Sequence, residues 1–258
     1  ATDADGDGLT YSLTGTDASS FNINSSSGVI TFNSAPDHET KSSYSVTVNA
    51  SDGTTATTQA VTINVTDVND NSIITSSDTF NAAENQTSVG TVNATDADGD
   101  GLTYSLTGTD AASFTISNSG VINFIAAPDY ETKSSYSITV NVSDGTSTVT
   151  QSLTISVTNV NDSFPMITSS ATFSIEENAG VLTVGTATAT DAENAVLSYS
   201  LTGPDAISGN WGVNINSSSG VIATNWIPDY ETKSSYSVTL NVSDGTNTTT
   251  QALTIDVT

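Results

Sequence analysis

The 258-residue chain has no cysteine and only three basic residues against 28 acidic ones. Without cysteine it can have no disulfide framework, thiolate metal site or cysteine nucleophile. A formal net charge of −25 excludes non-specific binding to nucleic acid and attachment to an anionic membrane through a basic face. No apolar run approaches the roughly 20 residues of a membrane span. Without disulfides the chain needs another source of stability, and a bound metal ion is the obvious candidate.

Residues that favour helix are also scarce, and runs of Ala, Leu, Glu or Lys at helical spacing are absent. Thr, Ser, Val, Asn and Asp dominate instead, which is typical of strands and turns. Hydrophobic residues make up 35% of the chain, enough for small sandwiches whose strands bury one face each. The composition therefore predicts an all-β protein.

Internal repetition is the main feature of the sequence. The segment TDADGDGLTYS at 2–12 recurs identically at 95–105 and, as TDAENAVLSYS, at 190–200. The motif PDHETKSSYS begins at Pro36, and PDYETKSSYS begins at Pro128 and Pro228. Successive copies are 92 to 100 residues apart, which is the size of a seven-stranded sandwich. Three units are therefore predicted.

The unit boundaries are placed in the acidic segments DVNDN (67–71) and NVNDS (159–163). They give a first unit at 1–70 that lacks its opening strand, a complete second unit at 71–162, and a third unit at 163–258 with an insertion near 207–212. Because the chain starts in the middle of the repeat pattern, we expect an internal segment of a longer protein.

Strand-like alternation supports these units. Every second residue is apolar over 136–142 and over 153–157, as in strands with one buried face. Apolar residues at 114, 116, 121 and 122 flank the turn sequence Ser-Asn-Ser-Gly, which predicts a hairpin.

Acidic residues recur at five places in the unit, all at predicted strand ends: an early Glu-Asn, Asp-Ala-Asp or its variant, Asp-X-Glu, the Asp of Ser-Asp-Gly, and the acidic linker. Calcium binds six to eight oxygen ligands, and such sites are commonly assembled from loops. Asp and Asn are also common turn formers, which is the simpler explanation for any single position. A surface adapted to high salt would scatter the acids over strand faces.

Together these motifs resemble the cadherin repeat. The linker at 67–71 is similar to the family's D-x-N-D-N, Asp96-Ala97-Asp98 to D-x-D, Asp129-Tyr130-Glu131 to D-x-E, Ala83-Glu84-Asn85 to x-E-N, and Asp144 to its late single Asp. The resemblance covers the whole chain. It implies tandem seven-stranded Greek-key, immunoglobulin- or cadherin-like β-sandwiches in a linear array, with Ca²⁺ at each junction between units.

The resemblance also implies the ligands. At the first junction they are Asp37, Glu39, Asp67, Asn69, Asp70 and Asn71 from the first unit and linker, with Asp96, Asp98 and Asp144 from the second unit. At the second junction they are Glu84, Asp129, Glu131, Asn161 and Asp162, with Asp191, Glu193 and Asp244. Asp3, Asp5 and Asp52 would face a preceding unit, and Glu177, Asp229 and Glu231 a following one.

Three further observations refine this assignment. Asn159, Ser163 and Glu193 depart from the family pattern, so we expect weaker or fewer ions at the second junction. An EF-hand is excluded for the segment that begins at Asp96, because its twelfth position is Thr107 and the following residues continue as a strand. The ligand sets contain 20 of the 28 acids, which favours cation sites over a salt-adapted surface.

Enzyme signatures are missing. The only histidine, His38, is interpreted as a surface variant of a position that is Tyr in the other copies, and no phosphate loop or zinc cluster is present. Each of the three lysines follows Glu-Thr and is expected to cover an edge or pair with a nearby acid. Trp211 and Trp226 either cover the end of a core or contact a sugar or partner.

These observations predict a calcium-stiffened extracellular spacer, similar to the extender regions of large bacterial RTX-type surface adhesins. The expected partners are calcium ions and neighbouring units. The alternative is a recognition module that binds a glycan or a protein, including another copy, and the third unit's insertion favours it.

Overall fold

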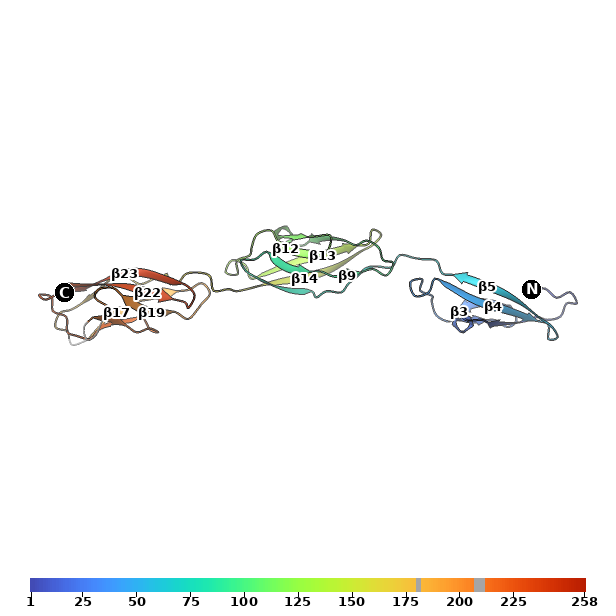
Figure 1. The fold of residues 1–258 in the computed structure, drawn as a ribbon, viewed down its shortest axis with the longest axis horizontal. Coiled ribbons are helices and arrows are strands. Elements are labelled where there is room, and N and C mark those ends of the chain that lie inside the picture. The colour runs from blue at the N-terminus through green and yellow to red at the C-terminus, as the bar shows by residue number, and fades with distance from the viewer. Residues whose placement is uncertain (180–181, 207–211) are drawn as a thin grey trace.

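The structure is a computed structural model that describes residues 1–179, 182–206 and 212–258. Three groups of β-sheets follow one another in an extended row, with the N- and C-termini at opposite ends (Figure 1). The predicted insertion near 207–212 falls almost entirely outside the described residues, as does Trp211.

The middle unit consists of two facing sheets and a short strand pair. One sheet has the order β10 (Thr103–Thr107), β13 (Ser135–Ser143), β14 (Thr148–Thr158) and β7 (Thr79–Ala83). The other has the order β11 (Phe114–Ile116), β12 (Val121–Phe124) and β8 (Ser88–Thr91). The pair is β6 (Ile73–Ile74) with β9 (Ala94–Thr95). All pairings are antiparallel except that of β7 with β14.

The third unit repeats this arrangement. Its larger sheet is β16 (Thr172–Ile175), β23 (Thr248–Val257), β22 (Ser235–Ser243) and β19 (Ser198–Thr202). Its smaller sheet is β17 (Thr183–Thr186), β21 (Val221–Thr224) and β20 (Val213–Ile215), and β15 (Met166–Ile167) pairs with β18 (Ala189–Thr190).

The first unit has smaller sheets. They are β1 (Thr10–Thr14), β4 (Ser43–Ser51) and β5 (Ala56–Asn64) in one, and β2 (Phe21–Ile23) with β3 (Ile30–Phe32) in the other. Single 3-10 turns precede β2 (Ala18–Ser20) and β11 (Ala111–Ser113).

The strand pattern predicted from the sequence is confirmed in the middle unit. Ile138, Val140 and Val142 alternate with more exposed residues and are at most 1% exposed, because one face of β13 packs against the opposite sheet. The hairpin is also present, with Phe114 opposite Phe124. The chain is an all-β array of Greek-key sandwiches, as predicted.

Aromatic residues close one side of each core. In the middle unit Phe114, Phe124 and Tyr136 form a trio with ring centroids 4.4 to 5.5 Å apart. In the third unit Trp226 contacts Tyr236 at 5.1 Å and packs against the buried cluster. Trp226 is therefore a core-covering residue.

Candidate metal sites at the unit junctions

The acidic motifs lie in loops at the ends of the sandwiches. The segment 36–42 connects β3 to β4, and the linker 67–71 connects β5 to β6. From the next unit come the segment 96–102, which follows β9, and the turn between β13 and β14. Loops from two units therefore meet at the first junction, and the same loops of the second and third units meet at the next one.

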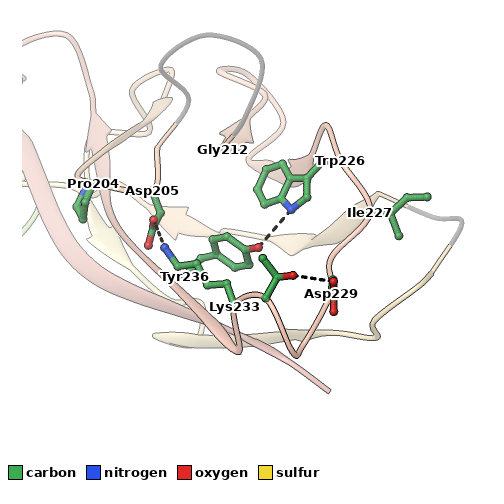
Figure 2. Close-up of a pocket in the computed structure, with 9 residues that line it drawn as sticks. Pro204, Asp205, Gly212, Trp226, Ile227, Asp229, Lys233 and Tyr236 are labelled. Carbon is green, nitrogen blue, oxygen red and sulfur yellow. Dashed lines mark hydrogen bonds and ion pairs between the residues drawn. The ribbon is translucent and has the colours of Figure 1, made fainter.

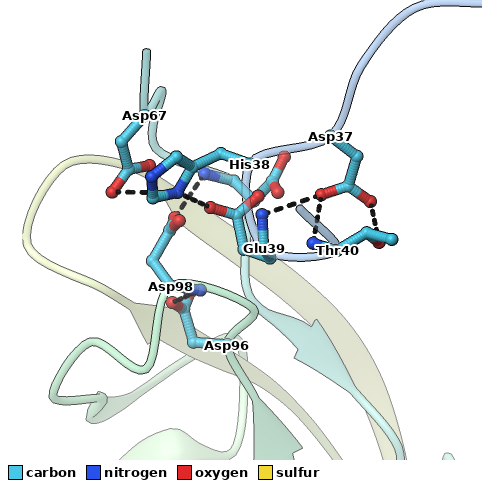
Figure 3. Close-up of polar contacts among 8 residues, drawn as sticks. Asp37, His38, Glu39, Thr40, Asp67, Asp96 and Asp98 are labelled. Atoms are coloured by element: carbon cyan, nitrogen blue, oxygen red, sulfur yellow. Dashed lines mark hydrogen bonds and ion pairs between the residues drawn. The ribbon is translucent and has the colours of Figure 1, made fainter. Parts of the chain in front are cut away.

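At the first junction, carboxylates from both units converge. Glu39, Asp70 and Asp98 each place an oxygen within 4.8 Å of the other two. Asp98 Oδ2 accepts a hydrogen bond from the backbone N of Asp70 at 2.6 Å, whereas its Oδ1 is buried and has no hydrogen-bond partner. Figure 3 shows Asp98 directed from the second unit toward His38 and Glu39 of the first. A cation there would be shared by the two units.

Asp96 extends this cluster. Its Oδ1 accepts hydrogen bonds from the backbone N of Asp98 at 3.1 Å and of Asp100 at 3.2 Å, while its Oδ2 is buried without a partner. Carboxylate oxygens of these three Asp residues also lie within 4.8 Å of one another. Asp100, which is not among the ligands inferred from the motifs, thus belongs to the cluster. Like charges at this spacing repel unless a cation lies between them.

Asp144 connects the linker to the turn between β13 and β14. It accepts hydrogen bonds from the side-chain and backbone donors of Ser147, the backbone N of Thr146 and the amide of Asn69, at 2.5 to 3.3 Å. These donors hold the pKa of Asp144 well below its usual range. The carboxylate is therefore ionised while only 7% exposed.

The second junction repeats the convergence. Glu131, Asp162 and Glu193 place oxygens within 4.8 Å of one another. Both Glu193 carboxylate oxygens and Oδ2 of Asp191 are buried without hydrogen-bond partners. Burial, together with the nearby Glu84, Glu193 and Asp129, raises the pKa of Glu131. The site therefore disfavours negative charge unless a cation is bound.

Glu84 ties the second unit to its following linker. It is 2% exposed, and its carboxylate accepts hydrogen bonds from the backbone N of Tyr130, at 2.8 Å, and of Val160. The neighbouring Asn85 donates its amide to Asp162. Oδ1 of the linker residue Asn161 and, from the third unit, Oδ2 of Asp244 are buried without partners.

The residues assigned to the outer ends form the same kinds of hydrogen bond as their counterparts at the junctions. Asp3 accepts from the backbone N of Asp5 and Asp52 from that of Thr55. At the other end, Glu177 accepts from the backbone N of Tyr230 and Asp229 from that of Glu231. Asp37 and Asp129 close their own turns through the equivalent Thr40 and Thr132.

The donor chemistry fits a hard cation. The unpartnered atoms of the inferred ligands are carboxylate and amide oxygens, which calcium prefers. A buried polar atom without a partner is costly unless something satisfies it. Besides Asp100, sequence reasoning missed His38, whose Nδ1 lies 2.9 Å from Oε1 of Glu39 and 3.6 Å from Oδ2 of Asp67. The hydrogen bond to Glu39 raises the pKa of His38.

The Cadherin domain family model matches residues 1–66, 78–158 and 171–258. The chain belongs to the cadherin domain family. Mouse protocadherin Fat 4 is 39% identical over 140 residues, which are 50% of this chain and 3% of that protein. The three-domain structure of mouse cadherin-23 EC22-24 is 26% identical with a TM-score of 0.68, over 97% of this chain and 86% of that one.

A fragment of protocadherin gamma B2, comprising extracellular cadherin domains 3-6, has the same fold with a TM-score of 0.73 and 22% identity, over 97% of this chain and 66% of that one. The chain is an extracellular array of cadherin repeats, a module of adhesion proteins. Among the described residues, no helix is long and apolar enough to cross a membrane.

Proposed function

We propose that the chain is a calcium-stiffened spacer in which Ca²⁺ at each junction locks neighbouring cadherin repeats into an extended row. The observation that carries the proposal is the set of buried, unpartnered carboxylate oxygens at both junctions, on Asp96, Asp98, Asp191 and Glu193. Asp98 clusters with Glu39 and Asp70 of the first unit, and Glu193 clusters with Glu131 and Asp162 of the second, so one ion at each junction would bind to two units. Without the ion, charge repulsion would open the hinge.

The unit boundaries follow from this proposal. We place them at 70/71 and 162/163, so that all but the last residue of each linker belongs to the unit before it, and the first unit of this sequence lacks the opening strand. The ligand sets inferred from the motifs then belong to the two junctions and the two outer ends. The first junction retains the full family linker, whereas Asn159 and Ser163 alter the second.

We further propose that the array is the extender region of a large surface adhesin, of the bacterial RTX type. Near-identical, cysteine-free repeats rich in Thr, Ser, Asn and Asp support an extender role. Extracellular calcium modules bind with dissociation constants of about 10⁻⁴–10⁻³ M, which suits a calcium-rich medium. The relatives described above are animal proteins, so this context rests on composition and repetition.

Calcium-dependent melting tests the proposal. Adding Ca²⁺ to the chelator-treated chain is expected to raise its Tm, because the ion binds only the folded array. Asp98→Asn is expected to reduce that rise, whereas Asp78→Asn, which removes an exposed carboxylate beside the middle of the second sandwich, is expected to leave it unchanged. A Tm that is independent of calcium would rule the proposal out.

A cleft in the third unit favours recognition as a second function. About 470 Å³ in volume, it is lined by Trp226, Ile227, Tyr236 and Lys233, among others (Figure 2). Ile227 is 60% exposed, and aromatic rings beside polar groups suit a sugar ring. On a glycan array, Ile227→Ala is expected to weaken binding and the similarly exposed Ile125→Ala in the second unit to leave it intact. Absence of any glycan binding would refute this second function.

A further inference from the structure

The first junction contains a histidine, which a calcium site built from oxygen ligands does not use. The second junction has no histidine at the equivalent position. His38 occupies the middle of the Asp-X-Glu motif, where the second unit has Tyr130. Tyr130 packs against the buried core of its own unit. His38 instead lies among carboxylates, with Nδ1 2.9 Å from Oε1 of Glu39 and 3.6 Å from Oδ2 of Asp67 (Figure 3).

The spacing of these three atoms suits a small tetrahedral ion. The nitrogen and the two oxygens all lie within 4.8 Å of one another. Ligand atoms of a tetrahedral zinc site, with bonds of about 2.0–2.1 Å, are about 3.3 Å apart. The distances of 2.9 and 3.6 Å lie on either side of that value. The side chains of His38, Glu39 and Asp67 are 31%, 21% and 57% exposed, so an ion can reach them.

The chemistry of the group separates it from the calcium ligands. Calcium takes oxygen ligands, whereas neutral imidazole nitrogen suits zinc and its neighbours among the transition metals. Asp98 is the candidate for a fourth ligand. An oxygen of Asp98 lies within 4.8 Å of one of Glu39, its Oδ1 is buried without a hydrogen-bond partner, and Figure 3 shows the side chain directed toward His38. A bound ion would thus again connect the first unit to the second.

We propose that His38, Glu39 and Asp67 form a zinc site that the first junction has and the second lacks. The second junction has Tyr130 in place of His38 and Asn159 in place of Asp67, so two of the three ligands are missing. Glu39 and Asp67 also belong to the inferred calcium set. Zinc and calcium therefore compete at the first junction, and zinc replaces calcium there when calcium is scarce.

Zinc titration of the whole chain, made metal-free with a chelator and exchanged into chelator-free buffer, tests this site by calorimetry. One zinc ion is expected to bind per chain at this site. His38→Tyr and Asp67→Asn, each of which installs the residue of the second junction, are expected to weaken binding on the order of tenfold or more. Equal zinc affinity in His38→Tyr and the unmodified chain, or no zinc binding by the unmodified chain, would overturn the proposal.

A gain of function provides the matched test. Tyr130→His alone is expected to add no site, whereas Tyr130→His together with Asn159→Asp is expected to add a second zinc ion. If the double variant does not fold, which a melting curve will show, the two loss-of-ligand variants still decide the question. A calcium titration of His38→Tyr distinguishes this proposal from the spacer function. The variant keeps the oxygen ligands of the calcium site, so it is expected to lose zinc binding and to keep calcium binding.

Discussion

Each of the three lysines stabilises its own unit through the same three-residue contact. In the second unit Lys133 Nζ lies 2.5 Å from Oδ1 of Asp110 and 4.6 Å from the centre of the Tyr136 ring. Asp110 Oδ2 also accepts a hydrogen bond from the backbone N of Ser137 at 2.8 Å. Asp110 precedes the 3-10 turn and Ser137 lies in β13, so the contact fastens the connection between the sheets.

Replacing this carboxylate should lower stability in a pH-dependent way. The Lys133 ammonium and the Ser137 backbone N–H hold the pKa of Asp110 below its ordinary value. Its stabilisation is therefore present above the unfolded-state pKa of about 3.9 and is lost as pH falls through the folded-state pKa. Loss of about 1 kcal/mol would lower Tm by about 4–8 °C in a domain of this size. We expect a lower Tm for Asp110→Asn at pH 7.

A control variant and a pH series show whether loss of the negative charge causes the lower Tm of Asp110→Asn. Asp78→Asn removes the same charge from an exposed position and should leave Tm nearly unchanged. The difference between Asp110→Asn and the unmodified chain should shrink as the pH falls below about 4, because Asp110 then takes up a proton, first in the unfolded chain and at still lower pH in the folded chain. A difference in Tm that persists undiminished at low pH would show that the charge is not responsible.

At the residue scale, the sequence predicted the acidic motifs better than the contacts that individual side chains make. The Asp-X-Glu and Asp-Ala-Asp motifs were recognisable because they recur. The pairing of Lys133 with Asp110, 23 positions away, was not, because it depends on how the loop before β11 folds back against β13. The unpartnered oxygens of Glu193 were equally invisible, since burial and partners are properties of the folded chain.

At the scale of elements, one glycine fixes the hairpin between β11 and β12. Gly120 has a φ of +77°, and a Cβ there would lie 2.1 Å from the carbonyl oxygen of Val92. The backbone N of Val92 in turn donates to the carbonyl oxygen of Gly120 at 2.9 Å. The hairpin thus contacts the backbone segment between β8 and β9. In the first unit, the nearest atoms to a Cβ on the equivalent Gly28 would be those of the Tyr11 ring, at 3.2 to 3.3 Å.

Gly120→Ala is expected to destabilise the second unit more than Gly28→Ala destabilises the first. Both changes place a side chain at positive φ, which costs on the order of 1 kcal/mol. Only Gly120→Ala also forces a Cβ against backbone. Calorimetric unfolding of the two variants measures the difference. Equal losses of stability in the two variants would mean that the close approach of residue 120 to the Val92 backbone does not affect stability.

Element types were largely predictable and their pairings were not. Alternation over 136–142 predicted β13 and its buried face because the strand period repeats over several residues. The parallel pairing of β7 with β14 joins Thr79 to Thr154, and no local pattern specifies such a contact. The short pair β6 and β9, which lies beside the first junction, is too brief for a period to appear.

At the scale of the whole molecule, clusters of acidic residues lie at the junctions, where single linkers connect the units. The chain carries a net charge of −25, and its sandwiches are joined by single linkers such as 67–71. The clusters of Glu39, Asp70 and Asp98, and of Glu131, Asp162 and Glu193, each combine carboxylates from adjoining units. Under the proposed function, the rigidity of the row would depend on what neutralises these clusters.

Small-angle X-ray scattering of the whole chain, with about 1 mM calcium and after chelation, tests this claim most directly. With calcium we expect the maximum dimension of a single extended particle. After chelation we expect a flexible ensemble with a smaller mean radius of gyration, while circular dichroism shows that the sandwiches stay folded. An identical scattering profile in both conditions would contradict the claim that calcium holds the row extended.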